Sequence, residues 1–524
     1  MDVLIQVVWY GDRPDVISRG YWDQGFLEEF FARHLWKPPG PTEFKHMAAG
    51  EADGRGAVVV VPARWHAGRE AEVREFADGL AWCLLVLTGD EENAFDRSGW
   101  DPLGERTRVW VQTPRPDTAR EGERYIGDMC PPEARQLGLM DWTKDRDWFF
   151  AGQINTLDRS ELQMAMGESE HFTGTNTFGS GLPYAEYLSE MARSKVAPCP
   201  GGPFTPDTFR LFEALEAGCA PVVRDDPYWA VLGDPPLVKT ADWRRGIKQA
   251  LRDWPDSATR ASCWYQRYKR EIARRFYADL FELSGEPRPE ARMTVLMPTS
   301  SAPADPSTEI IEETVSSLPS GVEVIMMMDG LHFRHQHRFA QYAEYRRRVA
   351  WLCEHRWTNV LPIFFEEHLH QAEMTRRALG EVHTPQILFV EHDTPLVGEV
   401  PWAQMSEVVA SGEADVIRLH HEAHILPEHE HLMRGGVEEV AGVPMRRTAQ
   451  WSQRPHLASA AFYRRVIAQH FTPASRTFIE DVVHSPAQDP ACDWKLWIYH
   501  PPGDMKRSRH LDAREGEPKV PMVP

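Results

Sequence analysis

Three features that often announce a function are missing from this 524-residue sequence. Its seven cysteines are scattered and form no Cys-x-x-Cys pair, which is typical of a reducing compartment and of mostly buried thiols. The longest apolar runs, 56–63 and 81–88, fall well short of the ~20 residues that cross a bilayer. The N-terminal residues have neither the basic start nor the apolar stretch of a signal peptide. We therefore expect a cytoplasmic protein without membrane insertion.

Basic residues are fewer than acidic residues. Lys and Arg total 58 against 78 Asp and Glu, which gives a net charge of -20. This balance opposes loose, charge-driven binding to nucleic acid or anionic lipid, although it is compatible with a local basic groove. No Gly-x-Gly-x-x-Gly follows the first apolar run, 3–9, which disfavours a nicotinamide-dependent Rossmann enzyme. The hydrophobic fraction of 42% excludes a mainly disordered or fibrous chain, and the length suggests about three folding units.

A short polar stretch with one glycine and two prolines, 284–290, breaks the sequence into two halves. A helix is predicted before it, at 258–283. Apolar strands alternate with helical segments in both halves, which predicts α/β units with mostly parallel sheets. We expect two Rossmann-like lobes at 1–140 and 141–285 and a third domain at 291–524. The predicted strands are 3–9, 56–61, 83–87, 108–112, 147–151, 195–198, 220–223, 294–297, 322–328, 387–390 and 415–419.

The most informative stretch of the first half is 194–223, in which a strand leads through a Gly-rich loop to a helix and a second strand. Thr205 is predicted to cap the helix, with Pro206 at its first position. Gly218 is expected to end the helix in the left-handed conformation. A Gly-rich loop and a helix start offer backbone N–H groups to a diphosphate, and Glu213 can accept hydrogen bonds from ribose hydroxyls.

This stretch resembles the nucleotide-sugar half of GT-B glycosyltransferases, and most closely the exostosin-like family. The resemblance covers about 75 residues and includes Phe149–Gly152. It implies that Glu213 binds the ribose, that Arg159 and Lys195 approach the diphosphate, and that no metal is needed. Asp12 and Asp23 are candidates for the base of this module, and the alternative is an ordinary Rossmann helix whose Glu213 and Arg210 form a surface pair. The matching residues are Ser194, Lys195, Cys199, Pro200, Gly201, Arg210, Glu213, Ala214, Gly218, Cys219, Pro221 and Val222.

The second half resembles GT-A glycosyltransferases of the family-2 type. Its first strand ends in Pro298-Thr299, the next is followed by Asp329, and a later apolar strand runs into Glu391-His392-Asp393. By the resemblance, Thr299 and Asp329 contact the nucleotide. Glu391 and Asp393 stand where the family has an Asp-x-Asp motif that holds Mn²⁺ or Mg²⁺ on the diphosphate. Glu391 departs from that pattern, so Asp393 is the safer ligand, and a solvated loop is the alternative.

Two further segments complete the resemblance. Family-2 enzymes carry a Glu-Asp pair at about the place of Glu480-Asp481, which makes Asp481 the expected catalytic base and Glu480 an acceptor contact; the alternative is an acid pair at a helix N-terminus. Near the C-terminus, His510 is the expected further metal ligand, with His500 second. Lys506, Arg507 and Arg509 are expected to cover phosphate oxygens, or to form a solvated basic tail. The His-rich run 420–431 lacks the His-Glu-x-x-His spacing of a zinc site.

Together these motifs predict a bifunctional glycosyltransferase: a GT-B-like pair of lobes followed by a GT-A-like domain that inverts configuration. The expected partners are a nucleotide-sugar donor, above all a UDP-sugar, and a hydroxyl acceptor on a glycan or glycoconjugate. Two alternatives stay open, namely transfer to hydroxymethylated bases of phage-type DNA and a non-catalytic scaffold that binds glycans or nucleotide sugars. The scaffold alternative is favoured if Asp393 and Asp481 do not face one pocket.

Overall fold

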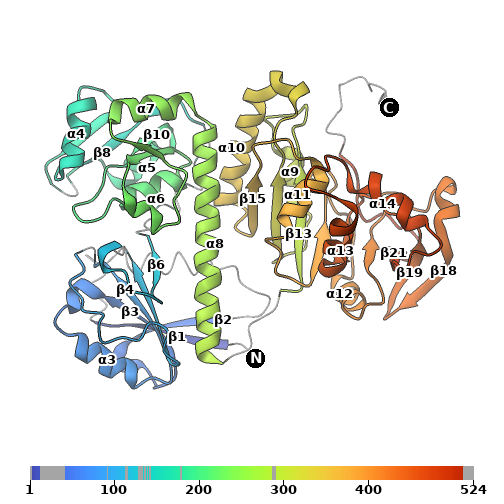
Figure 1. The fold of residues 1–524 in the computed structure, drawn as a ribbon, viewed down its shortest axis with the longest axis horizontal. Helices are drawn as coiled ribbons and strands as arrows, with labels where there is room; N and C mark the ends of the chain where they lie inside the picture. Colours follow the sequence, from blue (N-terminus) through green and yellow to red (C-terminus); the bar gives the residue numbers. More distant parts are fainter. Residues whose placement is uncertain are drawn as a thin grey trace. The chain divides into compact units, whose positions relative to one another are not determined.

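The computed structural model describes residues 3–11, 42–90, 92–112, 116–127, 143–177, 180–285 and 291–511, and the single residues 134, 137 and 140. The chain is a mixed α/β protein built on largely parallel sheets (Figure 1), so the predicted fold class is confirmed. It forms two compact units. Unit 1 contains Met1–Pro289 and Ala350–Thr358, and unit 2 contains Glu290–Val349 and Asn359–Pro524. Nothing in the sequence indicated that 350–358 belongs with the first half.

The first sheet of unit 1 is entirely parallel, in the order β2-β1-β3-β4-β5-β6. Its central strands β3 and β4 are buried at every position, which explains their continuous apolar sequence. Asp12 and Asp23, the candidates for a base here, lie outside the described residues. The elements are β1 (Val3–Trp9), β2 (Thr42–Ala48), β3 (Ala57–Pro62), α3 (Glu70–Asp78), β4 (Cys83–Thr88), β5 (Thr107–Gln112) and β6 (Arg124–Ile126), with short 3-10 turns at Ala49–Glu51, Ala63–His66 and Pro116–Thr118.

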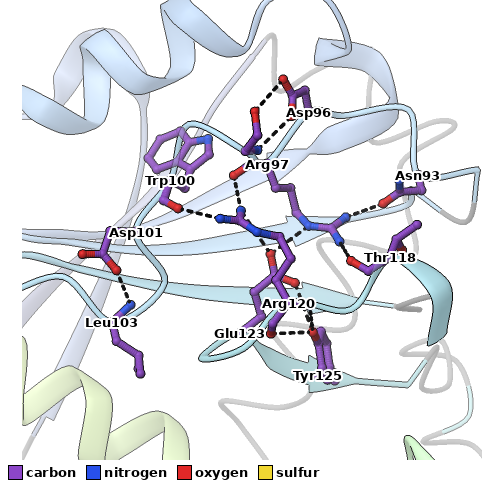
Figure 2. A network of polar contacts seen from close by, with 11 residues as sticks. Asn93, Asp96, Arg97, Trp100, Asp101, Leu103, Thr118, Arg120, Glu123 and Tyr125 are labelled. Atoms are coloured by element: carbon purple, nitrogen blue, oxygen red, sulfur yellow. Dashed lines mark hydrogen bonds and ion pairs between the residues drawn. The ribbon is translucent and has the colours of Figure 1, made fainter.

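A buried polar network joins the loop after β4 to the loop after β5 (Figure 2). Arg97 lies at its centre. Its Nε donates to Glu123 Oε1 at 2.9 Å, and its two Nη atoms donate to Asn93 Oδ1 at 2.6 Å and to the Thr118 carbonyl at 2.8 Å. Tyr125 donates its hydroxyl to Glu123 Oε2 at 3.2 Å. These contacts hold two loops together at the carboxyl edge of the sheet.

The second sheet of unit 1, in the order β12-β11-β10-β7, is also parallel, and β8 and β9 form a separate pair. The predicted strand 147–151 is therefore two short strands. The elements are β7 (Arg146–Trp148), β8 (Phe150–Gln153), α4 (Leu157–Met166), β9 (Phe172–Thr175), α5 (Tyr184–Ala192), β10 (Ser194–Pro198), α6 (Phe209–Glu216), β11 (Ala220–Arg224), a 3-10 turn (Pro227–Ala230), β12 (Val238–Thr240) and α7 (Trp243–Arg252).

The start of α6 differs from the prediction, whereas its end agrees. Thr205 does not cap the helix, because α6 begins at Phe209 and the buried Thr205 hydroxyl donates to the Asp207 carbonyl at 3.3 Å. Gly218 ends the helix with a φ of 64°, as predicted. The strand β11 follows at once, so the predicted strand–loop–helix–strand order holds.

Helix α8 (Asp256–Ser284) packs on both sheets of unit 1 (Figure 1), touching β4 and β11. Near its C-terminal end Asp279 accepts a hydrogen bond from Trp110 Nε1 at 3.0 Å. Near its middle the buried Lys269 lies between two buried carboxylates, Glu216 and Glu354. Burial, and then the proximity of Glu216, raises the pKa of Glu354 to about 8. This triad fastens 350–358 to unit 1.

Unit 2 contains a nine-stranded sheet in the order β15-β14-β13-β16-β20-β17-β21-β19-β18. Strands β13 to β17 and β21 run parallel, and β20 runs antiparallel between β16 and β17. The elements are β13 (Met293–Thr299), α9 (Glu309–Ser316), β14 (Glu323–Met328), a 3-10 segment (Phe333–Arg338), α10 (Phe339–His355, whose last turns from Ala350 belong to unit 1), β15 (Val360–Phe364), α11 (His370–Ala378), β16 (Gln386–Phe389), α12 (Trp402–Ala410), β17 (Val416–Arg418), a 3-10 segment (Pro427–Leu432), β18 (Met433–Val440), β19 (Val443–Thr448), β20 (His456–Ser459), α13 (Ala460–His470), α14 (Ile479–Gln488) and β21 (Leu496–Tyr499).

The order of these strands reverses at one place in the sheet. From β13 the chain moves outward through β14 to β15, and then returns to place β16 on the other side of β13. In open α/β sheets ligands bind at the carboxyl ends of the strands where the order reverses in this way. In unit 2 the order reverses at the carboxyl ends of β13 and β16, which makes this edge the candidate site.

Candidate functional site

Four of the predicted site residues of unit 2 come directly after, or at the end of, parallel strands. Thr299 ends β13, Asp329 follows β14, and Glu391 and Asp393 follow β16. Because these strands are parallel neighbours, the four residues share the carboxyl edge of the sheet. The edge is also tied together by backbone bonds, since Asp329 N donates to the Thr299 carbonyl at 3.0 Å and His392 N to the Pro298 carbonyl at 3.3 Å.

Asp329 is buried, at 1% exposure, and its carboxylate accepts three backbone hydrogen bonds. One oxygen accepts from the N–H groups of Gly330 and Leu369, and the other accepts from His370 N at 3.0 Å and lies 2.9 Å from His368 Nδ1. Asp329 thus fixes the turn that begins α11. The contact with a nucleotide that the resemblance implies stays a prediction.

Glu391 is joined to the start of α14 by a single side chain. Gln371 Nε2 donates to Glu391 Oε1 at 2.8 Å, and Gln371 Oε1 accepts from Ile479 N at 3.1 Å. Burial, then the charges of Asp393 and Glu480, raise the pKa of Glu391 to about 8. The acidic groups of the two predicted motifs are therefore close enough to repel one another.

Glu480 and Asp481 occupy the first turn of α14, where the helix dipole favours negative charge. Glu480 Oε2 accepts from Gln453 N at 2.9 Å. Asp481 is exposed and accepts from Thr477 Oγ1 at 3.3 Å. Of this pair, Asp481 is the more exposed residue, and its role as a base stays a prediction.

The C-terminal segment 505–511 returns to this edge. Its backbone pairs with the loop after β16: Arg509 N donates to the Pro395 carbonyl at 3.1 Å and Leu511 N to the Asp393 carbonyl at 2.7 Å. This pairing places His510 Nε2 3.4 Å from Asp393 Oδ2. Among the described residues no group of three or more His, Cys, Asp and Glu side chains is arranged to hold a metal ion. Asp393 and His510 thus form a carboxylate–imidazole pair, and their role as metal ligands stays a prediction.

The three predicted phosphate-binding cations lie on the same segment with different surroundings. Lys506 is exposed. Arg507 donates to the Glu399 carbonyl at 2.9 Å and lies over the Tyr499 ring, and Arg509 pairs with Glu313. An anionic ligand would thus compete with Glu313 for Arg509.

Sequence reasoning missed a buried basic group beside these residues. Arg454 donates to Glu422 Oε1 at 2.9 Å and lies 2.6 Å from His420 Nδ1, and Arg418 is buried next to them. Burial, followed by the charge of Arg454, lowers the pKa of His420 to about 3 and that of Arg418 to about 9. His421 contacts Ser508 Oγ at 2.8 Å, so this histidine belongs with the C-terminal segment. The sequence singles out His420 only as part of the His-rich run 420–431, and neither Arg418, at the end of β17, nor Arg454 stands in a spacing pattern that could have revealed the group.

In unit 1, Glu213 is buried in α6 and both its oxygens are occupied. Tyr184 donates its hydroxyl to one oxygen at 2.7 Å and Tyr187 to the other at 2.5 Å. Burial raises the pKa of Glu213 against the effect of these bonds. A surface pair between Glu213 and Arg210 is therefore wrong. Arg210 instead stacks on Phe150, with its guanidinium carbon 4.4 Å from the ring centroid, and donates to the Ala151 carbonyl.

The Gly-rich loop of unit 1 is held by its own neighbours. Asp158 Oδ2 accepts from Gly201 N at 2.8 Å, while Asp158 Oδ1 pairs with Arg224. A Cβ on Gly152, which ends the stretch Phe149–Gly152, would lie 2.5 Å from Arg210 Nη2, so a larger residue there would require the Arg210 side chain to shift. A diphosphate at Gly201 would have to displace Asp158.

The other two predicted cations of unit 1 face acceptors of the protein. Lys195 Nζ pairs with Asp147 at 2.8 Å and lies over the Trp254 ring. Arg159 donates to the Gln153 carbonyl at 3.2 Å and to Asn155 Oδ1 at 3.0 Å. Their roles toward a diphosphate stay predictions.

Solved structures that resemble the chain include glycosyltransferases. TarS of S. aureus is 13% identical with a TM-score of 0.27, over 42% of this chain and 37% of that one. A fragment, TarS 1-349 in complex with UDP-GlcNAc, is 15% identical with a TM-score of 0.28, over 43% and 60%. GalNAc-T7 with UDP, GalNAc and Mn²⁺ is 9% identical with a TM-score of 0.29, over 44% and 46%. The chain thus spans less than two thirds of each, and at such scores the likeness establishes no function.

No family model matches the sequence, and no curated protein does. Among the helices that the structure describes, none combines the length and the apolar character that crossing a bilayer requires.

Proposed function

We propose that unit 2 is a nucleotide-sugar glycosyltransferase of the GT-A type. The observation that carries this proposal is the return of the C-terminal segment, which brings His510 to 3.4 Å from Asp393 at the point where the strand order reverses. Two residues far apart in sequence meet beside the strand ends where a nucleotide is expected. Gln371 links that place to the helix that carries Asp481.

In this proposal Asp393 and His510 hold a Mn²⁺ or Mg²⁺ ion, with Glu391 beside them. The ion would neutralise charge on the departing diphosphate. Thr299 and Asp329 lie where the nucleotide would bind, and Lys506, Arg507 and Arg509 line the segment that would cover the phosphates. Carboxylate, imidazole and phosphate oxygens together suit either ion.

The proposed chemistry is a single displacement with inversion. The acceptor oxygen bonds to the anomeric carbon while the bond from that carbon to the diphosphate breaks, and the leaving diphosphate keeps the electron pair. The acceptor's proton passes to Asp481, whose carboxylate is exposed at the start of α14. Glu480 supports the acceptor from the same turn.

For unit 1 we propose a GT-B module of the exostosin-like type, with lobes at 1–140 and 141–285, followed by the GT-A module at 291–524. The order of its parallel strands supports it. A ribose at Glu213 would have to displace the hydroxyls of Tyr184 and Tyr187. In this proposal Glu213 meets the ribose, and Arg159, Lys195, Gly201 and Arg210 meet the diphosphate. The module would use a second UDP-sugar without a metal, and an acceptor hydroxyl on a glycan or glycoconjugate.

Release of nucleotide from a panel of UDP-, GDP- and dTDP-sugars, with and without Mn²⁺, tests the proposal. We expect Mn²⁺-dependent release from one donor, and a loss of about 100-fold or more in Asp481→Asn, since a general base contributes about that much. Any release that persists without Mn²⁺ should disappear in Glu213→Gln. If no donor is cleaved or bound, with or without candidate acceptors, the proposal fails for both units.

A further inference from the structure

Five rings lie in an unbroken row beside Asp481 in unit 2. We call this row the ring strip. Its neighbours are in ring contact throughout: the centroid distances are 4.3, 4.8, 5.6 and 4.6 Å from one end to the other. In order, the rings are those of Phe333, His332, His368, His370 and Phe478.

The five rings come from three separate segments of unit 2. Phe333 and His332 come from the loop after β14, the next two histidines from the turn that begins α11, and Phe478 directly precedes α14. Phe478 lies three residues before Asp481 in the sequence, and the charge of Asp481 acts on His370. One end of the strip is therefore next to the proposed base.

The protein holds the middle of the strip at a conformational cost. His370 has a φ of 61°, a left-handed conformation that non-glycine residues seldom adopt. Asp329 maintains it by accepting from His370 N, and the same carboxylate orients the His368 ring through Nδ1. Strain of this kind persists only where the surrounding structure imposes it. In this conformation the His370 ring lies edge-on to the Phe478 ring.

The two ends of the strip face solvent as apolar rings. The exposed fraction is 72% for Phe333 and 42% for Phe478. Burial, and then the charge of neighbouring histidines, lowers the pKa of both His332 and His370, which disfavours their charged form. The strip thus offers apolar faces at its ends and imidazole nitrogens between them.

We propose that the ring strip binds the acceptor, and that the acceptor is a carbohydrate chain of several sugars. A sugar ring presents C–H groups on its faces and hydroxyls on its rim, which suit aromatic faces and imidazole nitrogens respectively. A row of rings ending at Asp481 would lead the terminal hydroxyl to the base. This inference rests on the proposed function, because it assigns the acceptor side of that reaction.

An array of neutral and acidic oligosaccharides, probed with the full-length protein, tests the inference. The dissociation constant of the best-binding oligosaccharide is then measured by calorimetry for the wild type, Phe478→Ala and His370→Gly. We expect each substitution to weaken binding about tenfold, the effect of losing one ring contact. His370→Gly should melt at the same temperature as the wild type or higher, because glycine adopts this φ without strain.

Phe339→Ala is the control. Phe339 is also an exposed phenylalanine of unit 2, at the start of α10, and it is not part of the strip. We expect it to bind the oligosaccharide as the wild type does.

The other outcomes separate this inference from the proposed function. If the wild type cleaves a donor but binds no oligosaccharide on the array, or if both strip variants bind as well as the wild type, the inference is wrong and the proposed function stands. If the strip variants lose affinity for UDP alone, the strip holds the nucleotide and the inference is overturned. If the protein cleaves no donor but binds a glycan, and the strip variants lose that binding, the ring strip is a glycan-binding site and the proposed transferase activity is wrong.

Discussion

Gln371 is the residue through which the two acidic motifs of unit 2 are held together. Its side chain is 3% exposed and uses both ends of its amide, donating to Glu391 and accepting from Ile479 N. The carboxyl group on one side and the first turn of α14 on the other are fixed by these two bonds. Gln371 is therefore a positioning residue for Asp481 in the proposed reaction.

Gln371→Leu is expected to lower the free energy of unfolding by about 2–4 kcal/mol, because it leaves a buried acceptor and a buried N–H without their partner. It should also lower kcat for donor cleavage while leaving KM nearly unchanged, because the start of α14 is no longer held and the Asp481 carboxylate loses its fixed position. Urea unfolding and steady-state kinetics measure the two effects.

Gln386→Leu is the matched control for this substitution. Gln386 is as deeply buried, and it exchanges two hydrogen bonds with Ser406 at the opposite, amino end of β16. The control should lose similar stability without the change in kcat. Equal kcat in the Gln371→Leu and Gln386→Leu variants would show that Gln371 has only a structural role.

Among the elements, the core strands with continuous apolar sequences could be predicted. The edge strands β2, β6, β12, β15 and β18 and the interior strands β19, β20 and β21 were not predicted. The core strands β3, β4 and β13 are buried along their length, so their sequences are unbroken apolar runs. Strand β18 is exposed over most of its length and contains two glycines and two glutamates, which leaves no alternation to detect. Thr205 failed as a helix cap because the loop folds back on itself before α6 begins.

The Arg97–Glu123 pair is expected to hold the loop after β4 against the loop after β5. Their side chains are 6% and 0% exposed. Removing one partner of such a pair leaves a buried charge and costs about 3 kcal/mol or more, so Arg97→Met should show a large loss of stability in urea unfolding. Arg69→Met, which breaks the exposed pair with Glu72, should leave the midpoint unchanged. Similar midpoints for both variants would mean that the network in Figure 2 does not hold these loops.

For the whole molecule, the order of the chemical motifs could be predicted from the sequence better than the division of the chain into two structural units. Asp393, Asp481 and His510 could be proposed because each stands in a short pattern after a strand, in a Glu-Asp pair, or in a late basic segment. Gln371, which bonds to Glu391 and to the first residue of α14, could not, because a lone glutamine has no pattern. The membership of 350–358 in unit 1 depends on the buried partners of Lys269 in the folded chain, which sequence order does not reveal.

The most direct test of the proposed active site is Mn²⁺ binding in the presence of UDP, measured by electron paramagnetic resonance on the wild type, Asp393→Ala and His510→Ala. If Asp393 and His510 hold the ion, the wild type should bind Mn²⁺ more tightly with UDP than without it, and both variants should lose that gain. Asp489→Ala and His431→Ala, at exposed positions of unit 2, should behave as the wild type. Unchanged Mn²⁺ binding in both Asp393→Ala and His510→Ala would contradict the metal site and, with it, the assignment of unit 2 as a GT-A enzyme.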